Sequence, residues 1–294
     1  MVLKVFGFLI LFFSLFFGYW IQGGDLELFL QPVEIGIIIG LGIGSFILSN
    51  PTQIPLEVVR RAGGVFKSHF FGKETYKEAI MLTAALSSVR QRAGERELEK
   101  ILDDRSHPFF NLYPELKKNE RVLDFTRSSM LTAMILSANS RSAPSDAIND
   151  AISSEVELFN TFQTQVANAL HDLSESMPAY GIVAAITGVI LAMSQLGESV
   201  DVVGYAISAA LMGTLMGIFI GYGLVKPMAS SFEHYAFEQR VLMDLIKKSI
   251  LMGMNNLPSN SIVEALANSV PQHARIDSFE VADMIRVMQG SQRG

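Results

Sequence analysis

The chain has 294 residues, 49% of them hydrophobic, and its mean hydropathy of +0.32 is typical of an integral membrane protein. It has no cysteine, which excludes disulfides, thiolate catalysis and cysteine-based metal sites. The formal net charge is −6 and the basic residues form no single block, so nucleic acid is not an expected partner.

Four charge-free intervals are each long enough to cross a bilayer, whose core of about 30 Å requires roughly 20 apolar residues in a helix. They are residues 5–24, 35–56, 176–197 and 202–225. The first is not read as a cleaved signal, because no small-x-small site follows it and aromatic residues continue to Trp20. The sequence therefore predicts an all-α integral membrane protein with four transmembrane helices, at about 4–21, 34–50, 177–196 and 202–225.

The distribution of charge predicts the orientation of these spans. The connections 22–33 and 197–201 contain acidic residues but no lysine or arginine. By the positive-inside rule both termini, together with residues 51–175 and 226–294, are expected in the cytoplasm.

Residues 1–50 are expected to form a transmembrane hairpin, in which Gly36, Gly40 and Gly44 allow another helix to approach closely. Residues 51–175 are expected to form a large helical cytoplasmic region between spans two and three, with amphipathic stretches at 73–104, broken near Gly94, and at 116–138. An apolar stripe then runs from Pro144 straight into the third span, so long cytoplasmic extensions of spans three and four are predicted.

Residues 176–225 form the second predicted hairpin. The tail, residues 226–294, continues the fourth span and then contains a loop at Pro258 and two short helices, the last at 278–288.

The chain contains none of the common catalytic signatures: neither a phosphate-binding G-x-x-x-x-G-K-[ST] loop, nor G-x-S-x-G, nor H-E-x-x-H. Its five histidines are far apart in sequence, so no enzyme activity, cofactor or metal site is expected. The charge-free intervals 5–24, 176–197 and 202–225 also contain no His, so spans one, three and four offer no ionisable Asp, Glu, Lys, Arg or His within the membrane. Because ionisable groups are what relay protons through a membrane, this chain is not expected to conduct protons alone.

Spans three and four instead present small and hydroxyl-bearing residues. Small residues recur every four positions in span four, a pattern that favours close helix packing; they are Ala209, Gly213, Gly217 and Gly221. Thr214 lies beside them, and span three offers Ala185 and Thr187. The threonine hydroxyls could face an ion path or bond the preceding turn of their own helix. Pro178 and Pro227 could be compliant joints or ordinary prolines near a membrane face.

Three segments carry a resemblance to a known family: Pro178-Ala179-Tyr180-Gly181-Ile182-Val183-Ala184-Ala185, then Gly213-Thr214-Leu215-x-Gly217, then Tyr222-Gly223 with Pro227. With four spans and one large loop, the chain resembles the MotA/PomA family of flagellar stator subunits. The resemblance implies a multi-pass protein of the bacterial inner membrane, with five copies around two copies of MotB. The membrane aspartate of MotB supplies the missing ionisable group, and ion flow turns the ring against FliG in the rotor.

The resemblance also implies residue roles. Pro178 and Pro227 match prolines needed for torque, and Thr214 matches a channel-facing threonine. The rotor charges are implied at Glu99 and at an arginine, for which Arg90 and Arg92 both qualify because they straddle the aligned position. Glu155 matches a further family acid. Without the resemblance, these charges read as an ordinary solvated helix face.

The resemblance leaves two questions open, namely which ion drives the protein and whether its function is that of a stator. Sodium-driven relatives have threonine where this chain has Ala185, and the missing hydroxyl favours proton drive, although Thr187 departs from the pattern. An energiser of the ExbB or TolQ type is the alternative function, but those relatives have three spans and a different loop order. A self-sufficient channel or a passive scaffold would be a different class of protein.

Overall fold

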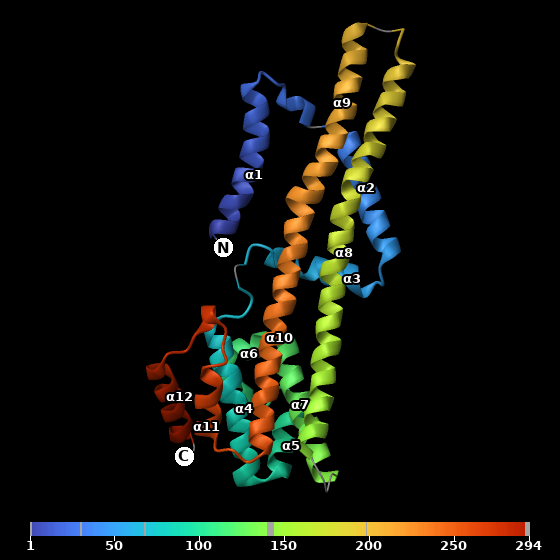
Figure 1. The fold of residues 1–294 in the computed structure, drawn as a ribbon. Coiled ribbons are helices and arrows are strands. Elements are labelled where there is room, and N and C mark those ends of the chain that lie inside the picture. The colour runs from blue at the N-terminus through green and yellow to red at the C-terminus, as the bar shows by residue number, and fades with distance from the viewer. Residues whose placement is uncertain (1, 30, 68, 140–143, 198, 292–294) are drawn as a thin grey trace. The chain divides into compact units, whose positions relative to one another are not determined.

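A computed structural model describes residues 2–29, 31–67, 69–139, 144–197 and 199–291. These residues are helical with short connections and contain no strand. They form two compact units, one made of Met1–Ser68 and Phe162–Tyr235 and the other of His69–Thr161 and Ala236–Gly294 (Figure 1). We call them unit 1 and unit 2.

Unit 1 contains the predicted spans. Four of the described helices are long and apolar enough to cross a membrane. They are α1 (Val2–Ile21), α2 (Pro32–Ser49), α8 (Pro144–Ser194) and the helix that starts with α9 (Val200–Ile218) and continues through η4 (Phe219–Val225) into α10 (Lys226–Met254). The prediction of an all-helical protein with four candidate spans is confirmed. A 3-10 turn, η1 (Leu26–Phe29), separates α1 from α2.

Helix α8 is a single helix of 51 residues, about 77 Å at 1.5 Å per residue. It is more than twice as long as a bilayer core is thick. The helix begins at Pro144, which suits a first turn because its missing N–H needs no partner there. It continues through Pro178 without ending.

The second long helix changes its hydrogen-bonding pattern once. From Phe219 to Val225 it is a π-helix, and the N–H of Lys226 bonds to the carbonyl of Gly221, five residues earlier. Pro227 follows at once and cannot donate to the preceding turn. The sequence analysis did not predict this π segment, which is a rare feature that is often found at functional sites.

Unit 1 also has a short helix that the sequence analysis did not predict, α3 (Gln53–Arg61), followed by the 3-10 turn η2 (Ala62–Gly64). Its Ile54 and Val58 are buried in one cluster with Leu170 of α8 and Phe232 of α10. Its other face leaves Val59 exposed. The amphipathic pattern of α3 is short, which explains why it was missed.

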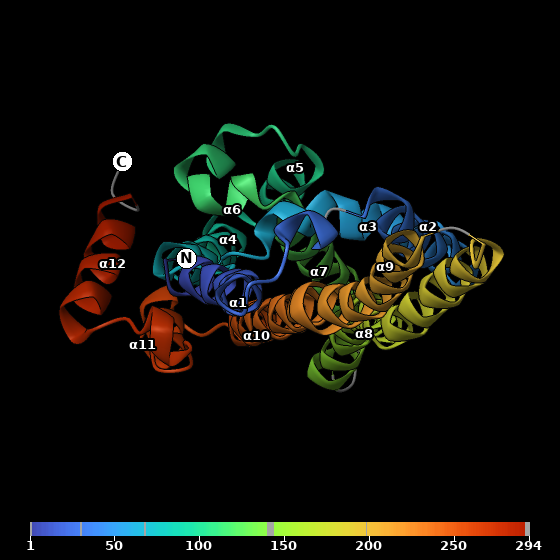
Figure 2. The same cartoon turned by 90° about the horizontal axis from the view of Figure 1, so that it is seen from above.

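Unit 2 is built around α4 (Lys73–Ala93), whose Tyr76, Ile80, Leu82 and Leu86 are fully buried. α5 (Glu95–Asp103), α6 (Pro114–Lys118) and α11 (Ser259–Ala267) pack on it, and α11 lies beside it in Figure 2. The unit also contains η3 (Pro108–Leu112), α7 (Glu120–Asn139), η5 (Gln272–Ala274) and α12 (Ser278–Ser291). The predicted break near Gly94 is the turn between α4 and α5, where Gly94 has a φ of +87°.

Helix α12 is held to α4 by ion pairs at its N-terminus. Glu280 pairs with Lys73 and, at 2.8 Å, with Lys77, both in the first turns of α4. Asp277 and Glu280 also exchange backbone and side-chain bonds of 3.0 and 2.9 Å, which is the arrangement of a capping box. The buried Met284 and Met288 provide the apolar contact of the helix.

The two lysines hold the pKa of Glu280 at about 2, well below its ordinary value of 4.5. A carboxylate whose pKa is lowered by folding stabilises the fold above its unfolded pKa, and that stabilisation is lost as the pH falls through the folded value. We therefore expect Glu280→Gln, which keeps the cap but loses the charge, to increase the hydrogen exchange of α12 at neutral pH. Glu280→Ala, which also loses the cap, should increase it further.

Lowering the pH from 4.5 towards 2 should reduce the protection factor of α12, which is corrected for the slower intrinsic exchange at low pH, by more in the unmodified chain than in Glu280→Gln. Exchange measured by mass spectrometry on peptides from 278–288 checks this. Equal protection in all three proteins at neutral pH would show that the two methionines alone hold the helix.

Candidate functional site

The first candidate site is the seam between α8 and α9, where the backbones touch. A Cβ on Gly217 would lie 2.6 Å from the Cα of Gly181 and 2.8 Å from the carbonyl oxygen of Met177. A Cβ on Gly181 would lie 3.0 Å from the carbonyl oxygen of Gly213. No side chain fits at these distances, so only glycine permits this approach.

The same contact continues towards both ends of the seam. A Cβ on Gly188 would lie 2.9 Å from the Cβ of Ala210, and one on Gly213 would lie 3.4 Å from the Cβ of Ala184. Gly213 and Gly217 of the recurring series thus face α8, and Ala210, not Ala209, makes the contact with Gly188. The sequence did not single out Gly181 as a packing position, although its separation of seven residues from Gly188 places both on one helix face.

Pro178 lies at the end of this seam, beside Gly221. A proline cannot donate to the carbonyl four residues earlier, which here is that of Ser174. Gly221 approaches this same carbonyl: its Cβ would lie 2.7 Å from the Ser174 oxygen and 3.3 Å from Cδ of Pro178. Because Gly221 belongs to η4, the proline of α8 and the π segment lie next to each other.

The candidate ion-path residues differ in how their polar groups are used. The Thr187 hydroxyl donates to the carbonyl of Ala184 at 2.7 Å, within its own helix. Thr214 is partly exposed, and its hydroxyl has no hydrogen-bond partner among the residues that the structure describes. Ala185 is also partly exposed and supplies no polar side-chain atom. Of the three, Thr214 has the hydroxyl available for an ion or water.

The glycines of α2 behave differently from those of α9. Within the described chain, a Cβ on Gly40 or Gly44 would meet nothing within 4 Å. It is Gly42 that packs inside the chain, since its Cβ would lie 2.9 Å from Sδ of Met177. Packing at Gly40 and Gly44 stays a prediction and concerns contacts with other chains.

The second candidate site lies in unit 2, where α4 ends and α5 begins. Arg90 closes the C-terminus of α10: its Nη2 donates to the carbonyls of Gly253 at 2.8 Å and Met254 at 3.3 Å, and to Oδ1 of Asn256 at 2.7 Å. Asn256 has a φ of 58°, and Leu257 donates to the carbonyl of Met252, which together form a Schellman ending. The Arg90 guanidinium thus donates its hydrogen bonds to oxygen atoms within the chain.

The other two candidate charges are on the surface. Arg92, in the last turn of α4, is exposed, and so is Glu99 on α5. Glu99 forms no ion pair or side-chain hydrogen bond with any described residue. The structure therefore separates the two arginines that the sequence could not distinguish.

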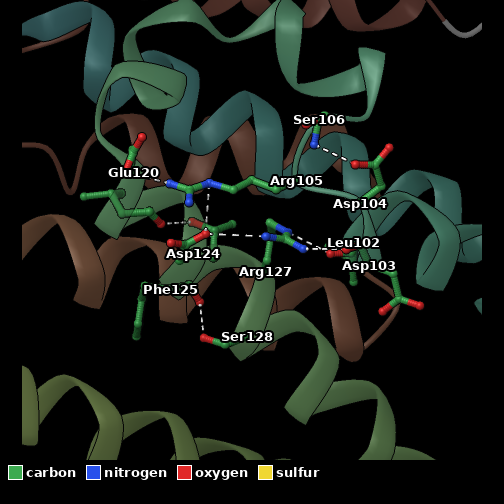
Figure 3. Close-up of polar contacts among 12 residues, drawn as sticks. Leu102, Asp103, Asp104, Arg105, Ser106, Glu120, Asp124, Phe125, Arg127 and Ser128 are labelled. Atoms are coloured by element: carbon green, nitrogen blue, oxygen red, sulfur yellow. Dashed lines mark hydrogen bonds and ion pairs between the residues drawn. The ribbon is translucent and has the colours of Figure 1, made fainter.

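Helix α5 is fixed to α7 by Arg127, which the sequence analysis did not single out. The Arg127 guanidinium donates to the carbonyls of Leu102 at 2.7 Å and Asp103 at 2.9 Å, at the C-terminus of α5 (Figure 3). A cation is favourable there because the last carbonyls of a helix carry partial negative charge. Arg105 adds ion pairs of 3.1 Å to Glu120 and 3.5 Å to Asp124 on α7 (Figure 3).

The side chain of Glu155 forms hydrogen bonds to α7. Its carboxylate accepts hydrogen bonds from the hydroxyls of Ser128 at 2.8 Å and Ser129 at 3.4 Å. Glu155 lies on α8 and both serines lie on α7, so the acid joins these helices. Together with the Arg127 contacts, it links α5, α7 and α8 inside unit 2.

Comparison with known proteins gives matches over nearly the whole chain. Residues 5–94 match the family model Motility protein A N-terminal, and residues 119–244 match the MotA/TolQ/ExbB proton channel family. Motility protein A of Escherichia coli K12 is 27% identical over 293 residues, covering 99% of this chain and 98% of that protein.

Solved structures share the fold. The chain is similar to one in a structure of C. jejuni MotAB, with a TM-score of 0.70 and 19% identity over 95% of this chain and 100% of that one. It is also similar to one in the flagellar MotAB stator complex from Bacillus subtilis, with a TM-score of 0.65 and 24% identity over 91% and 95% of the two chains. The two matched ranges, 5–94 and 119–244, show that this chain belongs to the MotA/TolQ/ExbB proton channel family, in its motility protein A branch.

Proposed function

We propose that this chain is the MotA-type subunit of a flagellar stator, which together with MotB conducts ions and converts their flow into torque on the rotor. The observation that carries the proposal is the seam of α8 and α9. It offers a path wall made of glycine, backbone carbonyls and the Thr214 hydroxyl, but its two spans contain no Asp, Glu, Lys, Arg or His. A second chain must supply that group, as an aspartate of MotB would.

The proposal includes an arrangement in the membrane. Residues 1–50 and 176–225 form hairpins in the bacterial inner membrane, and residues 51–175 and 226–294 are cytoplasmic, with both termini inside. Five copies surround two MotB helices, and Gly40 and Gly44, which are exposed in the single chain, pack against neighbouring chains. The charge asymmetry of the loops supports this orientation. Ala185, which lacks a hydroxyl, favours protons over sodium.

The movement that ion flow causes in the spans would be passed to the cytoplasmic extensions of α8 and α10. It would be passed on at two irregular places in these helices, Pro178 in one and η4 with Pro227 in the other. Missing or displaced backbone bonds make both places easier to bend than regular helix. Since α8 is one continuous helix, a shift at Pro178 is carried along it to Glu155, and from there through α7 to α5. Glu99 and Arg92 would then press on the charged surface of FliG.

An ExbB or TolQ-like energiser is the competing function. The match of residues 5–94 to the motility-specific N-terminal model favours the stator.

The first prediction concerns the gene as a whole. A strain that lacks it should assemble flagella that do not rotate, because torque generation and not assembly depends on the stator. Swimming restored from a plasmid should stop with a protonophore and should not follow external sodium. Normal swimming of the deletion strain would overturn the stator function, and sodium-dependent speed would overturn proton drive alone.

The second prediction tests the seam. Gly217→Ala places a methyl group 2.6 Å from the Gly181 Cα, so the backbones must separate and motility should fall at least tenfold. Gly204→Ala on the same helix is the control, because its Cβ meets nothing within 4 Å in the chain. Swimming speed and membrane protein level are measured together. Full motility of Gly217→Ala would show that the contact is dispensable.

The third prediction separates Arg90 from the surface charges. Arg90→Ala removes charged hydrogen bonds from the end of α10 and should lower the free energy of unfolding by about 2 kcal/mol. Glu99→Lys should leave stability unchanged. Both Glu99→Lys and Arg92→Glu should reduce torque, and charge reversal on the rotor surface should partly restore it.

Torque of single motors and the unfolding midpoint of the purified chain provide the two measurements. Glu264→Lys is the matched control, since Glu264 is an exposed acid on α11. If Glu99→Lys and Glu264→Lys have the same torque as the unmodified chain, Glu99 belongs to an ordinary solvated face.

A further inference from the structure

Three potential metal ligands from distant parts of the chain meet in unit 2. One ligand atom each from His69, Glu238 and His273 lies within 4.8 Å of the other two. His69 precedes α4, Glu238 lies on α10 and His273 lies in η5. The sequence analysis expected no metal site because these residues are separated by up to 204 positions.

The carboxylate at the centre of the cluster is buried and fixed in place. Glu238 is only 8% exposed, and its Oε2 accepts hydrogen bonds from the backbone N–H of Phe70 at 2.7 Å and Phe71 at 3.3 Å. Its Oε1 lies 2.9 Å from Nδ1 of His69. One oxygen is therefore oriented by the backbone, while the other faces the histidines.

The hydrogen bonds also define which histidine atoms have a lone pair available. Nε2 of His273 lies 3.2 Å from the carbonyl oxygen of Phe71, so this nitrogen donates and Nδ1 keeps its lone pair. A histidine that donates one nitrogen to a backbone carbonyl while offering the other is the usual arrangement around a bound metal ion. An ion would replace the proton shared between His69 Nδ1 and Glu238 Oε1.

A further polar group lies beside the cluster. The Tyr76 hydroxyl is buried and has no hydrogen-bond partner among the described residues. The Tyr76 ring lies edge-on to His273, with centroids 6.1 Å apart. The Tyr76 hydroxyl could bond a water that completes the coordination of an ion.

We propose that His69, Glu238 and His273 form a binding site for a divalent transition-metal ion of the zinc class. Two imidazole nitrogens and one carboxylate oxygen suit Zn²⁺ and disfavour Mg²⁺ and Ca²⁺, which prefer oxygen ligands. The fourth position is taken by water. The ion joins the segment before α4, α10 and the segment before α12, and so links three parts of unit 2 that are far apart in sequence.

Binding requires a small rearrangement. The His69 and His273 rings are stacked, with centroids 3.9 Å apart and planes 6° apart, whereas a ligated ion lies near the plane of each ring. One ring must therefore turn. Metal–ligand bonds of about 2.0–2.2 Å in a tetrahedral site place the ligand atoms roughly 3.3 Å from one another. The His69 side chain is 50% exposed and can turn without disturbing the core.

The test is metal binding by the full chain, purified through a tag without histidine, stripped with a chelator and returned to metal-free buffer. Titration with Zn²⁺ should give one ion per chain, and an excess of Zn²⁺ should raise the unfolding midpoint by roughly 3 °C. Co²⁺ in place of Zn²⁺ should give the visible absorption of a four-coordinate site. These readouts do not depend on motility.

Three variants and a control locate the ion. His69→Gln, His273→Gln and Glu238→Gln should each weaken Zn²⁺ binding at least tenfold, since even outer-shell changes at metal sites cost 10–100-fold. His234→Gln removes an exposed histidine outside the cluster and should bind as the unmodified chain does. Helix content by circular dichroism shows whether each variant is folded.

The unmodified chain decides the outcome even if a variant does not fold. Absence of stoichiometric Zn²⁺ binding would overturn the proposal and leave a stacked histidine pair beside a buried carboxylate. Binding that persists unchanged in His69→Gln and His273→Gln would equally overturn it.

Discussion

The contact between Gly181 and Gly217 is the constraint on which the membrane part of this chain depends. In lipid there is little hydrophobic gain when two apolar helices meet, so their association relies on close packing. Here the absence of side chains brings carbonyl oxygens of Met177 and Gly213 against the facing backbone. Such a seam fixes the hairpin, yet by itself it has no group that could bind or release a proton. The chemistry of ion transfer therefore has to come from another chain.

The seam ends where both of its helices are irregular. Pro178 leaves the Ser174 carbonyl without its usual partner, and Gly221, within the π segment, lies against that carbonyl. Two departures from regular helix at the same level mean that bending one helix there need not break regular hydrogen bonds in the other. This pairing is the physical basis of the role proposed above for Pro178 and Pro227.

Periodic features of the fold could be predicted from the sequence, and single long-range contacts could not. The apolar stripe after Pro144 predicted α8, and the break at Gly94 predicted the turn between α4 and α5. Helix α3 is too short for its pattern to stand out. The π segment depends on how Lys226 bonds to Gly221, which no residue pattern encodes. The meeting of His69 with His273 depends on tertiary folding alone.

Arg90 and Arg92, which precede Gly94, show that side-chain exposure and not charge alone decides which residue can contact another protein. Arg90 and Arg92 are equivalent in sequence, but the guanidinium of Arg90 bonds the carbonyls that end α10. Arg127 does the same for the end of α5. A surface that transmits force must not yield under it, and charged caps of this kind hold helix ends in place. Arginines used in this way are engaged within the chain. Glu99, on the helix that Arg127 holds, has no side-chain partner among the described residues and is the charge on which the proposed rotor contact chiefly rests.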